Sequence, residues 1–271
     1  MAELLVEAGE LLRPNDAVIF DCRFSLADPE EGRRLYRSGH VPGAFYLHLD
    51  EDLSGLTGAH GGRHPLPDPE SFAALLAAHG VGRDTPVIAY DDSRFAFAAR
   101  LWWMMRALGC RMPALLNGGF QAYLAAGGPQ ESGDVTPTPC DPVTVAGYTQ
   151  SCDIEGVRNA LAAGAVLVDS REPPRYAGLE EPIDPVAGHI PGALNRPWQG
   201  VTTDAGFVRD ATGLHDHWGD VLEEDELVVY CGSGVTACAN LFSLALLGRD
   251  DAVLYPGSWS DWCSYLPSGA S

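Results

Sequence analysis

An internal repeat constrains the fold of this 271-residue chain more than any other feature. Four blocks of residues occur in the same order in both halves of the chain, and the first two are offset by nearly the same number of positions. They are an apolar run that ends in Asp-x-Arg, a Gly-His-x-Pro-Gly-Ala motif, a second apolar run, and a block of glycine and aromatic residues. The blocks occupy 18–23, 39–44, 87–91 and 116–123 in the first half, and 166–171, 188–193, 228–231 and 255–262 in the second. The repeat predicts a tandem duplication.

Each copy alternates strand-like and helix-like stretches, which is typical of the α/β class. We therefore expect two tandem domains, each with a parallel sheet that has helices on both faces. The predicted domains are 1–128 and 151–271, and a Pro- and Gly-rich extended linker at 129–150 joins them. In such sheets ligands bind beyond the C-terminal ends of the strands, so residues that follow a strand are the first candidates for a site.

Cys231 follows one of these predicted strands, at 227–230. Gly232 and Gly234 come next, and apolar residues recur at helical spacing from Val235 on. A strand, a tight loop and a helix N-terminus surround a thiol with backbone N–H groups, which favours its ionised form. We interpret Cys231 as a nucleophile. A buried structural cysteine is the alternative, and we prefer it for Cys238, whose neighbours in the helical pattern are apolar.

In the first copy, Asp91 stands where the second copy has Cys231, and a second acid, Asp92, follows it. A carboxylate cannot act as a sulfur nucleophile, and two acids repel an anionic ligand. We expect the first domain to be catalytically inactive and to form one wall of a cleft.

Charge and cysteine content argue against several classes of function. The formal net charge is −20 and all 17 basic residues are arginine, which disfavours nucleic acids and anionic membranes as partners. No apolar run approaches the ~20 residues of a membrane span, and the start of the chain is acidic where a secretory signal is basic. We therefore expect a cytoplasmic protein. Seven cysteines without a Cys-x-x-Cys pair argue against a disulfide scaffold and against a zinc site.

The repeated blocks resemble the rhodanese superfamily, specifically its tandem-domain sulfurtransferases, over nearly the whole chain. The loop Cys231-Gly232-Ser233-Gly234-Val235-Thr236 is the most specific of the shared motifs. Its Gly-Ser-Gly sequence is similar to that of 3-mercaptopyruvate sulfurtransferases, whereas the members that prefer thiosulfate tend to carry Arg and Lys there.

The resemblance implies a reaction at Cys231. The thiolate attacks the sulfur of 3-mercaptopyruvate, pyruvate leaves, and a persulfide remains on the cysteine. A small thiol, a thioredoxin-like protein or cyanide then accepts the outer sulfur. The loop residues Gly232, Gly234, Val235 and Thr236 are expected to bind the substrate and to stabilise the sulfur anions through their N–H groups. No metal or organic cofactor is expected.

Three further residues are candidates for a proton relay because they match positions of the family's motifs. They are Ser233, His64 in Gly-Arg-His-Pro-Leu-Pro, and Asp50, for which Asp52 is an alternative. Such a relay would protonate the departing pyruvate enolate, a task that suits histidine.

Arg175 matches the family's arginine for the substrate carboxylate, which a guanidinium binds with two parallel hydrogen bonds. The family often has a second such arginine, but this chain has the acidic segment 180–185 there, and Arg63 or Arg94 could take its place. Two repeated features are interpreted as structural: an ion pair between Asp169 and Arg171, and turns at the histidines of the two Gly-His motifs.

Three other functions are weighed against this one. A thiosulfate sulfurtransferase would use the same cysteine with a different donor. A Cys-x5-Arg phosphatase would need an arginine where this chain has Ala237. A non-enzymatic sulfur carrier or scaffold would hold a persulfide without turning over small donors.

Overall fold

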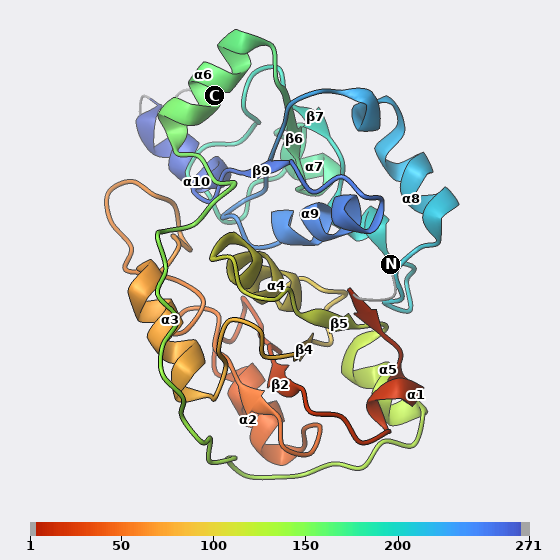
Figure 1. Cartoon of the computed structure of the whole chain (residues 1–271). Helices are drawn as coiled ribbons and strands as arrows, with labels where there is room; N and C mark the ends of the chain where they lie inside the picture. Colours follow the sequence, from red (N-terminus) through yellow and green to blue (C-terminus); the bar gives the residue numbers. More distant parts are fainter. Residues whose placement is uncertain (1–3, 267–271) are drawn as a thin grey trace. The chain divides into compact units, whose positions relative to one another are not determined.

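The computed structural model of the protein describes residues 4–266. They form two compact units, whose elements are labelled in Figure 1. Unit 1 comprises the residues up to 55 together with 66–149 and 204–208, and unit 2 comprises 56–65, 150–203 and the residues from 209 on. Two short segments, 56–65 and 204–208, thus belong to the unit built mainly from the other half of the sequence.

Unit 1 is built on a five-stranded sheet with the strand order β1-β5-β4-β2-β3, and every neighbouring pair is parallel. Its strands are β1 (Leu5–Val6), β2 (Val18–Asp21), β3 (Phe45–Tyr46), β4 (Val87–Tyr90) and β5 (Ala114–Leu116). Its helices are α1 (Ala8–Leu11), α2 (Glu31–Ser38), α3 (Pro69–Ala78), α4 (Ala98–Ala107) and α5 (Gly119–Ala125).

The strands of this sheet are apolar at nearly every position rather than at alternate ones, as expected for a parallel sheet that is covered on both faces. Ile19 and Ile88 pack with residues of α1 and α5 on one face. Phe20, which points to the other face, contacts the ring of His79 at the end of α3, with 5.6 Å between the ring centroids.

Unit 2 is built on a four-stranded parallel sheet with the order β7-β6-β8-β9. Its strands are β6 (Val166–Asp169), β7 (Leu194–Asn195), β8 (Leu227–Tyr230) and β9 (Val253–Leu254). Its helices are α6 (Ile154–Ala163), α7 (Pro173–Tyr176), α8 (Ala211–Trp218), α9 (Ala237–Leu246) and α10 (Ser258–Trp262), with 3-10 turns at Trp198–Val201, Gly219–Glu223 and Cys263–Tyr265. The predicted α/β fold with two parallel sheets is confirmed.

The central strand pairs, β2–β4 in unit 1 and β6–β8 in unit 2, have the same register. The repeat in the sequence is thus also a repeat in the structure. Asp21 lies opposite Tyr90 in unit 1, as Asp169 lies opposite Tyr230 in unit 2. Each aspartate forms an ion pair of 2.6 Å with the arginine two residues later, Arg23 or Arg171. The arginine also donates to the carbonyl of the glycine in the Gly-His motif, at 2.7 and 2.6 Å. Both pairs connect a strand end to the next turn, and the structural role predicted for Asp169 and Arg171 is confirmed.

The histidines of the repeated Gly-His motifs are also structural. His40 stacks on Tyr36 and His189 on Tyr176, with 4.0 Å between the ring centroids in both pairs. The Nδ1 atom of each histidine lies within 2.8 Å of the carbonyl oxygen of the same tyrosine.

Several helices begin at an aspartate that the sequence supplies. Asp68, Asp153 and Asp210 each accept a hydrogen bond from the N–H three residues on, at 2.8–2.9 Å, at the starts of α3, α6 and α8. Within residues 4–266, none of the helices has the length and apolar character that a membrane span requires.

The predicted linker, 129–150, runs along unit 1 as an extended segment, and backbone hydrogen bonds hold it there at several points. Glu131 and His40 exchange two backbone hydrogen bonds of 2.9 and 3.0 Å. Further on, the N–H of Cys140 donates to Ala77 at the end of α3, and the N–H of Thr149 donates to Ala107 at the end of α4. The segment up to residue 149 is therefore part of unit 1 rather than a free tether.

Candidate active site

Cys231 is the first residue after β8, and its backbone is fixed on both sides. Its N–H donates to Ser258 Oγ at 3.1 Å, and its carbonyl accepts the N–H of Trp259 at 3.0 Å. The residue is 1% exposed. Helix α9 begins at Ala237, two residues later than the apolar pattern from Val235 indicates. Cys238 lies inside this helix and is fully buried, as its structural interpretation requires.

The two glycines of the loop are required for different reasons. Gly234 has a φ of +76°, and a Cβ there would lie 2.3 Å from the carbonyl oxygen of Pro256. Gly232 instead leaves room for two side chains. A Cβ on Gly232 would lie 3.0 Å from a guanidinium nitrogen of Arg63 and 3.5 Å from two of Arg175. Both guanidinium groups therefore lie next to the residue that follows Cys231.

Ser233 and His64 form a hydrogen bond across 169 positions of sequence. The distance from Ser233 Oγ to His64 Nδ1 is 2.7 Å, and both residues are at most 9% exposed. The contact exists because segment 56–65 belongs to unit 2.

Segment 56–65 is held against α10 by hydrogen bonds from its backbone. The N–H of Gly61 donates to Asp261 Oδ1 at 2.7 Å, and the N–H of Arg63 donates to Ser260 Oγ at 3.1 Å. The backbone passes so close to Gly257 that a Cβ on Gly62 would lie 2.5 Å from its carbonyl oxygen. Both Arg63 and His64 are therefore positioned by α10.

The two aspartates proposed for the relay belong to unit 1 and lie in the turn around His48. Asp52 accepts the N–H of His48 at 2.7 Å, while the N–H of Asp50 donates to His48 Nδ1 at 3.1 Å. Burial raises the pKa of both carboxyl groups. The participation of Asp50, or of its alternative Asp52, in a relay with His64 stays a prediction.

The acidic segment that follows α7 holds the arginines of the site. Asp184 pairs with both Arg63 and Arg175, at 3.2 Å from the latter. Glu181 pairs with Arg175 at 2.7 Å and with Arg171 at 3.2 Å. The carboxylates are only 2–3% exposed. Both acids therefore act as buried counter-ions of the guanidinium groups.

Sequence reasoning missed the roles of Glu181 and Asp184, because their segment was interpreted only as lacking a second arginine. The available signal was a pair of acids three residues apart, each next to a proline, directly after a candidate substrate arginine. It also missed Ser258, whose hydroxyl accepts the N–H of Cys231 and donates to the carbonyl of Tyr255 at 2.9 Å.

In unit 1, Asp91 occupies the position equivalent to Cys231. Its carboxylate accepts hydrogen bonds of 2.8–3.1 Å from the N–H groups of Ser93, Phe95, Phe97 and Ala98. Burial raises the pKa of Asp91, and these hydrogen bonds act in the opposite direction. The N–H groups at this position of unit 1 are thus already bound by the carboxylate of Asp91.

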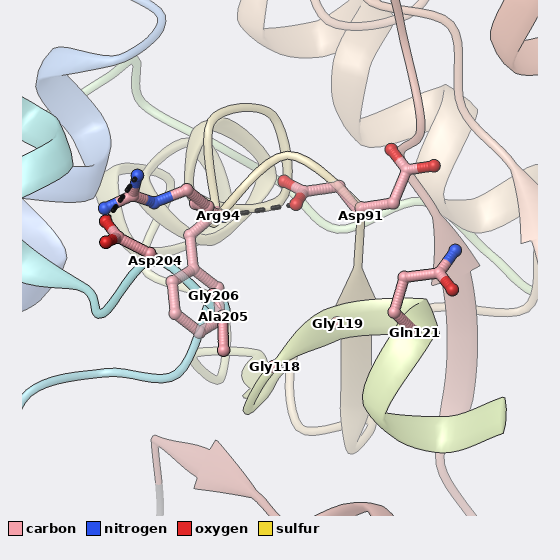
Figure 2. A pocket seen from close by; sticks show the side chains of 10 residues that line it. Asp91, Arg94, Gly118, Gly119, Gln121, Asp204, Ala205 and Gly206 are labelled. Atoms are coloured by element: carbon pink, nitrogen blue, oxygen red, sulfur yellow. Dashed lines mark hydrogen bonds and ion pairs between the residues drawn. The ribbon is translucent and has the colours of Figure 1, made fainter. Parts of the chain in front are cut away.

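A cavity of about 260 Å³ lies beside this loop. Figure 2 shows the residues around it, including the guanidinium of Arg94, 3.8 Å from the exposed carboxylate of Asp204. Arg94 and Phe95 have φ values of +61° and +69°, in the region that favours glycine. The position in unit 2 that corresponds to Arg94 is Gly234, which also has a positive φ, so unit 1 keeps this backbone conformation without the glycine.

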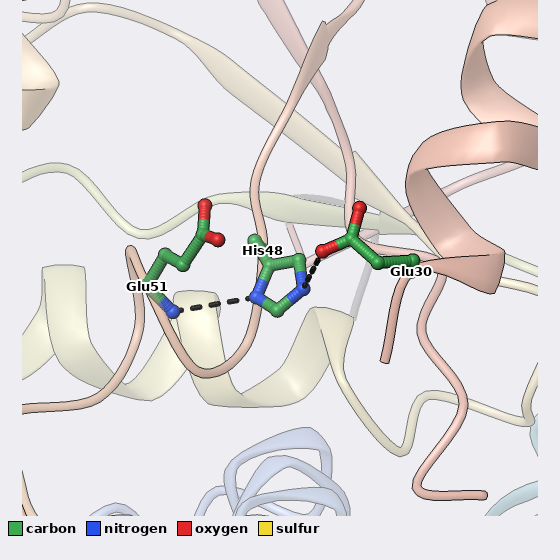
Figure 3. Close-up of side chains that lie close together, drawn as sticks. All are labelled: Glu30, His48 and Glu51. Atoms are coloured by element: carbon green, nitrogen blue, oxygen red, sulfur yellow. Dashed lines mark hydrogen bonds and ion pairs between the residues drawn. The ribbon is translucent and has the colours of Figure 1, made fainter. Parts of the chain in front are cut away.

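A second cluster in unit 1 contains the side chains of Glu30, His48 and Glu51, whose potential metal-ligating atoms all lie within 4.8 Å of one another (Figure 3). Nδ1 of His48 accepts the N–H groups of Asp50 and Glu51, at 3.1 and 3.3 Å. Nε2 therefore carries the proton, and it lies 3.1 Å from the carbonyl of Pro29. Both ring nitrogens are engaged, so we assign no metal site to this cluster.

Comparison with known proteins decides the family. The model of the rhodanese-like domain matches residues 5–126 and again residues 153–265. The chain belongs to the rhodanese family. It is a tandem member, with one rhodanese-like domain in each half of the sequence.

Named relatives cover almost the whole of this rhodanese. It is 43% identical to a probable 3-mercaptopyruvate sulfurtransferase of Pseudomonas aeruginosa, over 94% of this chain and 92% of the relative. It is 40% identical to a putative thiosulfate sulfurtransferase of Mycobacterium tuberculosis, over 97% and 94% of the two chains.

Among solved structures, it resembles the 3-mercaptopyruvate sulfurtransferase from Leishmania major. The TM-score is 0.86 and the identity 32%, over 96% of this chain and 74% of that one. The predicted membership of the tandem-domain sulfurtransferases and the predicted enzyme class are confirmed.

Proposed function

We propose that this protein transfers sulfur from 3-mercaptopyruvate to a thiol or to cyanide through a persulfide on Cys231. The observation that carries the proposal is the pair of guanidinium groups, Arg63 and Arg175, that lies next to Gly232. A carboxylate bound by these groups brings the rest of a small donor close to the neighbouring cysteine. The relatives named as 3-mercaptopyruvate sulfurtransferases support the choice of donor.

In the first half-reaction the Cys231 thiolate attacks the sulfur of the donor. A sulfur–sulfur bond forms, the carbon–sulfur bond breaks, and its electron pair leaves with the pyruvate enolate. The enolate takes up a proton and becomes pyruvate. The hydrogen-bonded pair of Ser233 and His64 supports a role for these residues in delivering that proton, with Asp50 or Asp52 as the third member.

In the second half-reaction the acceptor attacks the outer sulfur of the persulfide. The sulfur–sulfur bond breaks and its electron pair returns to Cys231. A thiol acceptor leaves as a persulfide and cyanide leaves as thiocyanate. We place the reaction in the cytoplasm, where acceptor thiols are kept reduced.

Unit 1 is proposed to be catalytically inactive because a carboxylate, Asp91, takes the place of the nucleophile. The loop residues Gly232, Gly234, Val235 and Thr236 are proposed to contact the donor and the transferred sulfur. Thiosulfate is the alternative donor, and the 40% identical relative named for it supports testing it directly.

The proposal is tested by mass spectrometry of the protein after exposure to each donor. We expect a mass gain of about 32 Da, one sulfur atom, on the peptide that contains Cys231, and release of pyruvate from 3-mercaptopyruvate. Modification of a different cysteine would contradict the proposal. A persulfide without turnover would identify a sulfur carrier instead.

Replacing Arg175 tests the binding of the donor carboxylate. Arg175→Ala is expected to raise KM for 3-mercaptopyruvate about ten- to hundredfold, the typical loss for a charged hydrogen-bonding partner. A donor without a carboxylate should be affected much less. An equal loss with both donors would show that Arg175 does not bind the carboxylate.

A further inference from the structure

The carboxylate of Asp184 connects the two arginines of the candidate site. It forms ion pairs with Arg63 and, at 3.2 Å, with Arg175, and its side chain is 2% exposed. The two arginine side chains are more exposed, at 31% and 15%. A ligand that approaches this cluster therefore meets guanidinium groups, while Asp184 lies buried with them.

The two guanidinium groups need a counter-ion to lie so close together. Burial lowers the pKa of Arg63, and the positive charge of Arg175 lowers it further. Asp184 pairs with both guanidinium groups, so its negative charge offsets the repulsion between them. The two groups can therefore lie side by side next to Gly232.

The ion-pair network around Asp184 is balanced in charge. Its guanidinium groups belong to Arg63, Arg171 and Arg175, and its carboxylates to Asp169, Glu181 and Asp184. Three charges of each sign leave a net charge of zero before a donor binds. A donor with one negative charge, such as an α-keto carboxylate, makes the occupied cluster −1, whereas the thiosulfate dianion makes it −2.

We propose that Asp184 is a positioning residue that sets donor selectivity: it holds Arg63 and Arg175 side by side and cancels one of their charges, which favours a monoanionic carboxylate donor over a dianion. The inference rests on the proposed function, because it concerns the donor of the same site. The selectivity between the two donors would then depend on the acidic segment 180–185 as well as on the cysteine loop 231–236.

The test compares kcat/KM for 3-mercaptopyruvate and for thiosulfate in wild type and in Asp184→Asn. Removing the buried negative charge is expected to raise the ratio of thiosulfate to 3-mercaptopyruvate activity about tenfold. The matched control is Glu180→Gln, which removes one negative charge from an exposed residue of the same segment. This control should leave the ratio unchanged because solvent screens the exposed carboxylate.

Asp184→Glu separates charge from geometry because it keeps the charge and lengthens the side chain. We expect its ratio to stay near that of wild type, with thermal unfolding of each variant recorded as a check of folding. If Asp184→Asn does not fold, Asp184→Glu carries the test: a tenfold change in its ratio would overturn the proposal.

Equal losses with both donors in Asp184→Asn would reduce Asp184 to a structural role and overturn the inference. The proposed function would stand in that case, provided that wild type still uses 3-mercaptopyruvate. A wild-type enzyme that transfers sulfur from neither donor would instead refute the proposed function itself, so the two failures are distinguishable.

Discussion

The loops that follow β4 and β8 begin from the same strand register but hold different side chains. In unit 1, the carboxylate of Asp91 accepts four hydrogen bonds from the amides of its own loop. In unit 2, the equivalent residue is Cys231, a thiol without a fixed charge. In unit 1 the loop and the start of α4 direct several N–H groups at one anion. Unit 1 supplies that anion permanently, whereas in unit 2 we infer that the reaction supplies it.

The difference extends to the residues that surround each loop. Unit 1 retains a positive φ at Arg94, where unit 2 has Gly234, and so carries backbone strain at a position with no proposed chemistry. The open space beside Gly232 is filled by the guanidinium groups of Arg63 and Arg175. The two units thus share the fold, while the described residues place a pair of guanidinium groups beside the loop of unit 2.

The largest expected effect comes from removing the nucleophile of unit 2. Cys231→Ser should lower sulfur transfer at least ~10³-fold, because the covalent intermediate cannot form. The matched control is Cys140→Ser, since Cys140 is an exposed cysteine of unit 1. Turnover of both variants is measured with 3-mercaptopyruvate and a thiol. Unchanged activity in Cys231→Ser would remove the functional distinction between the loops.

The equivalent serines of the two loops allow a direct comparison. Ser233→Ala should lower kcat about a hundredfold, the usual size of a general acid–base contribution, because its hydroxyl contacts His64. Ser93→Ala, the same change at the equivalent position of unit 1, should leave kcat unchanged. Steady-state kinetics check both values. A similar loss in both variants would show that the serine supports the loop shape rather than the reaction.

The carboxylate of Asp91 in unit 1 is tested through stability. Asp91→Ala leaves the four loop amides without their acceptor and is expected to destabilise unit 1 by about 3 kcal/mol, after relief of the buried charge offsets part of the loss. Asp91→Asn, which keeps one acceptor oxygen, should cost less. Hydrogen exchange of peptides from α4 measures the effect separately from unit 2.

Asp204→Ala serves as the control for Asp91→Ala, because the Asp204 side chain is fully exposed at the same cavity. It should change stability by no more than ~0.5 kcal/mol. Equal protection of α4 in Asp91→Ala and wild type would mean that the carboxylate does not stabilise the loop.

The side chains that contact the helices after the two loops predict a different response to pH, because α9 contacts a histidine of α8. Arg100 of α4 donates to the carbonyl of Leu53, whereas Asn240, at the equivalent position of α9, lies 3.4 Å from His217 Nε2. Burial lowers the pKa of His217 to about 4. The folded state therefore binds fewer protons than the unfolded state between pH 6.5 and 4, so stability falls as pH falls through this range.

This loss should reach up to about 3 kcal/mol at pH 4. Hydrogen exchange of α9 as a function of pH measures it, with α4 as the internal reference. His217→Gln should remove this pH dependence. His215→Gln, a change at an exposed histidine of α8, the helix that carries His217, should retain it. An unchanged profile in His217→Gln would assign the titration to another group.

The repeat, the parallel sheets and the place of Cys231 could be predicted from the sequence because they depend on local patterns. Apolar runs, glycines and helix starts each determine local structure within a few residues. The duplication repeats these patterns, so each prediction rests on two copies. The pairing of Ser233 with His64 followed only from family motifs, since 169 positions separate the two residues.

The arrangement of charges was decided by the tertiary structure alone. The sequence presents Glu181 and Asp184 only as acids where a second arginine was expected, but the fold buries them against Arg171, Arg175 and Arg63. Arg63 reaches that position only because segment 56–65 packs on α10. The sign of the electrostatic potential at a site depends on which charged groups lie within a few ångströms of it. Those distances are set by packing between segments that are far apart in the sequence.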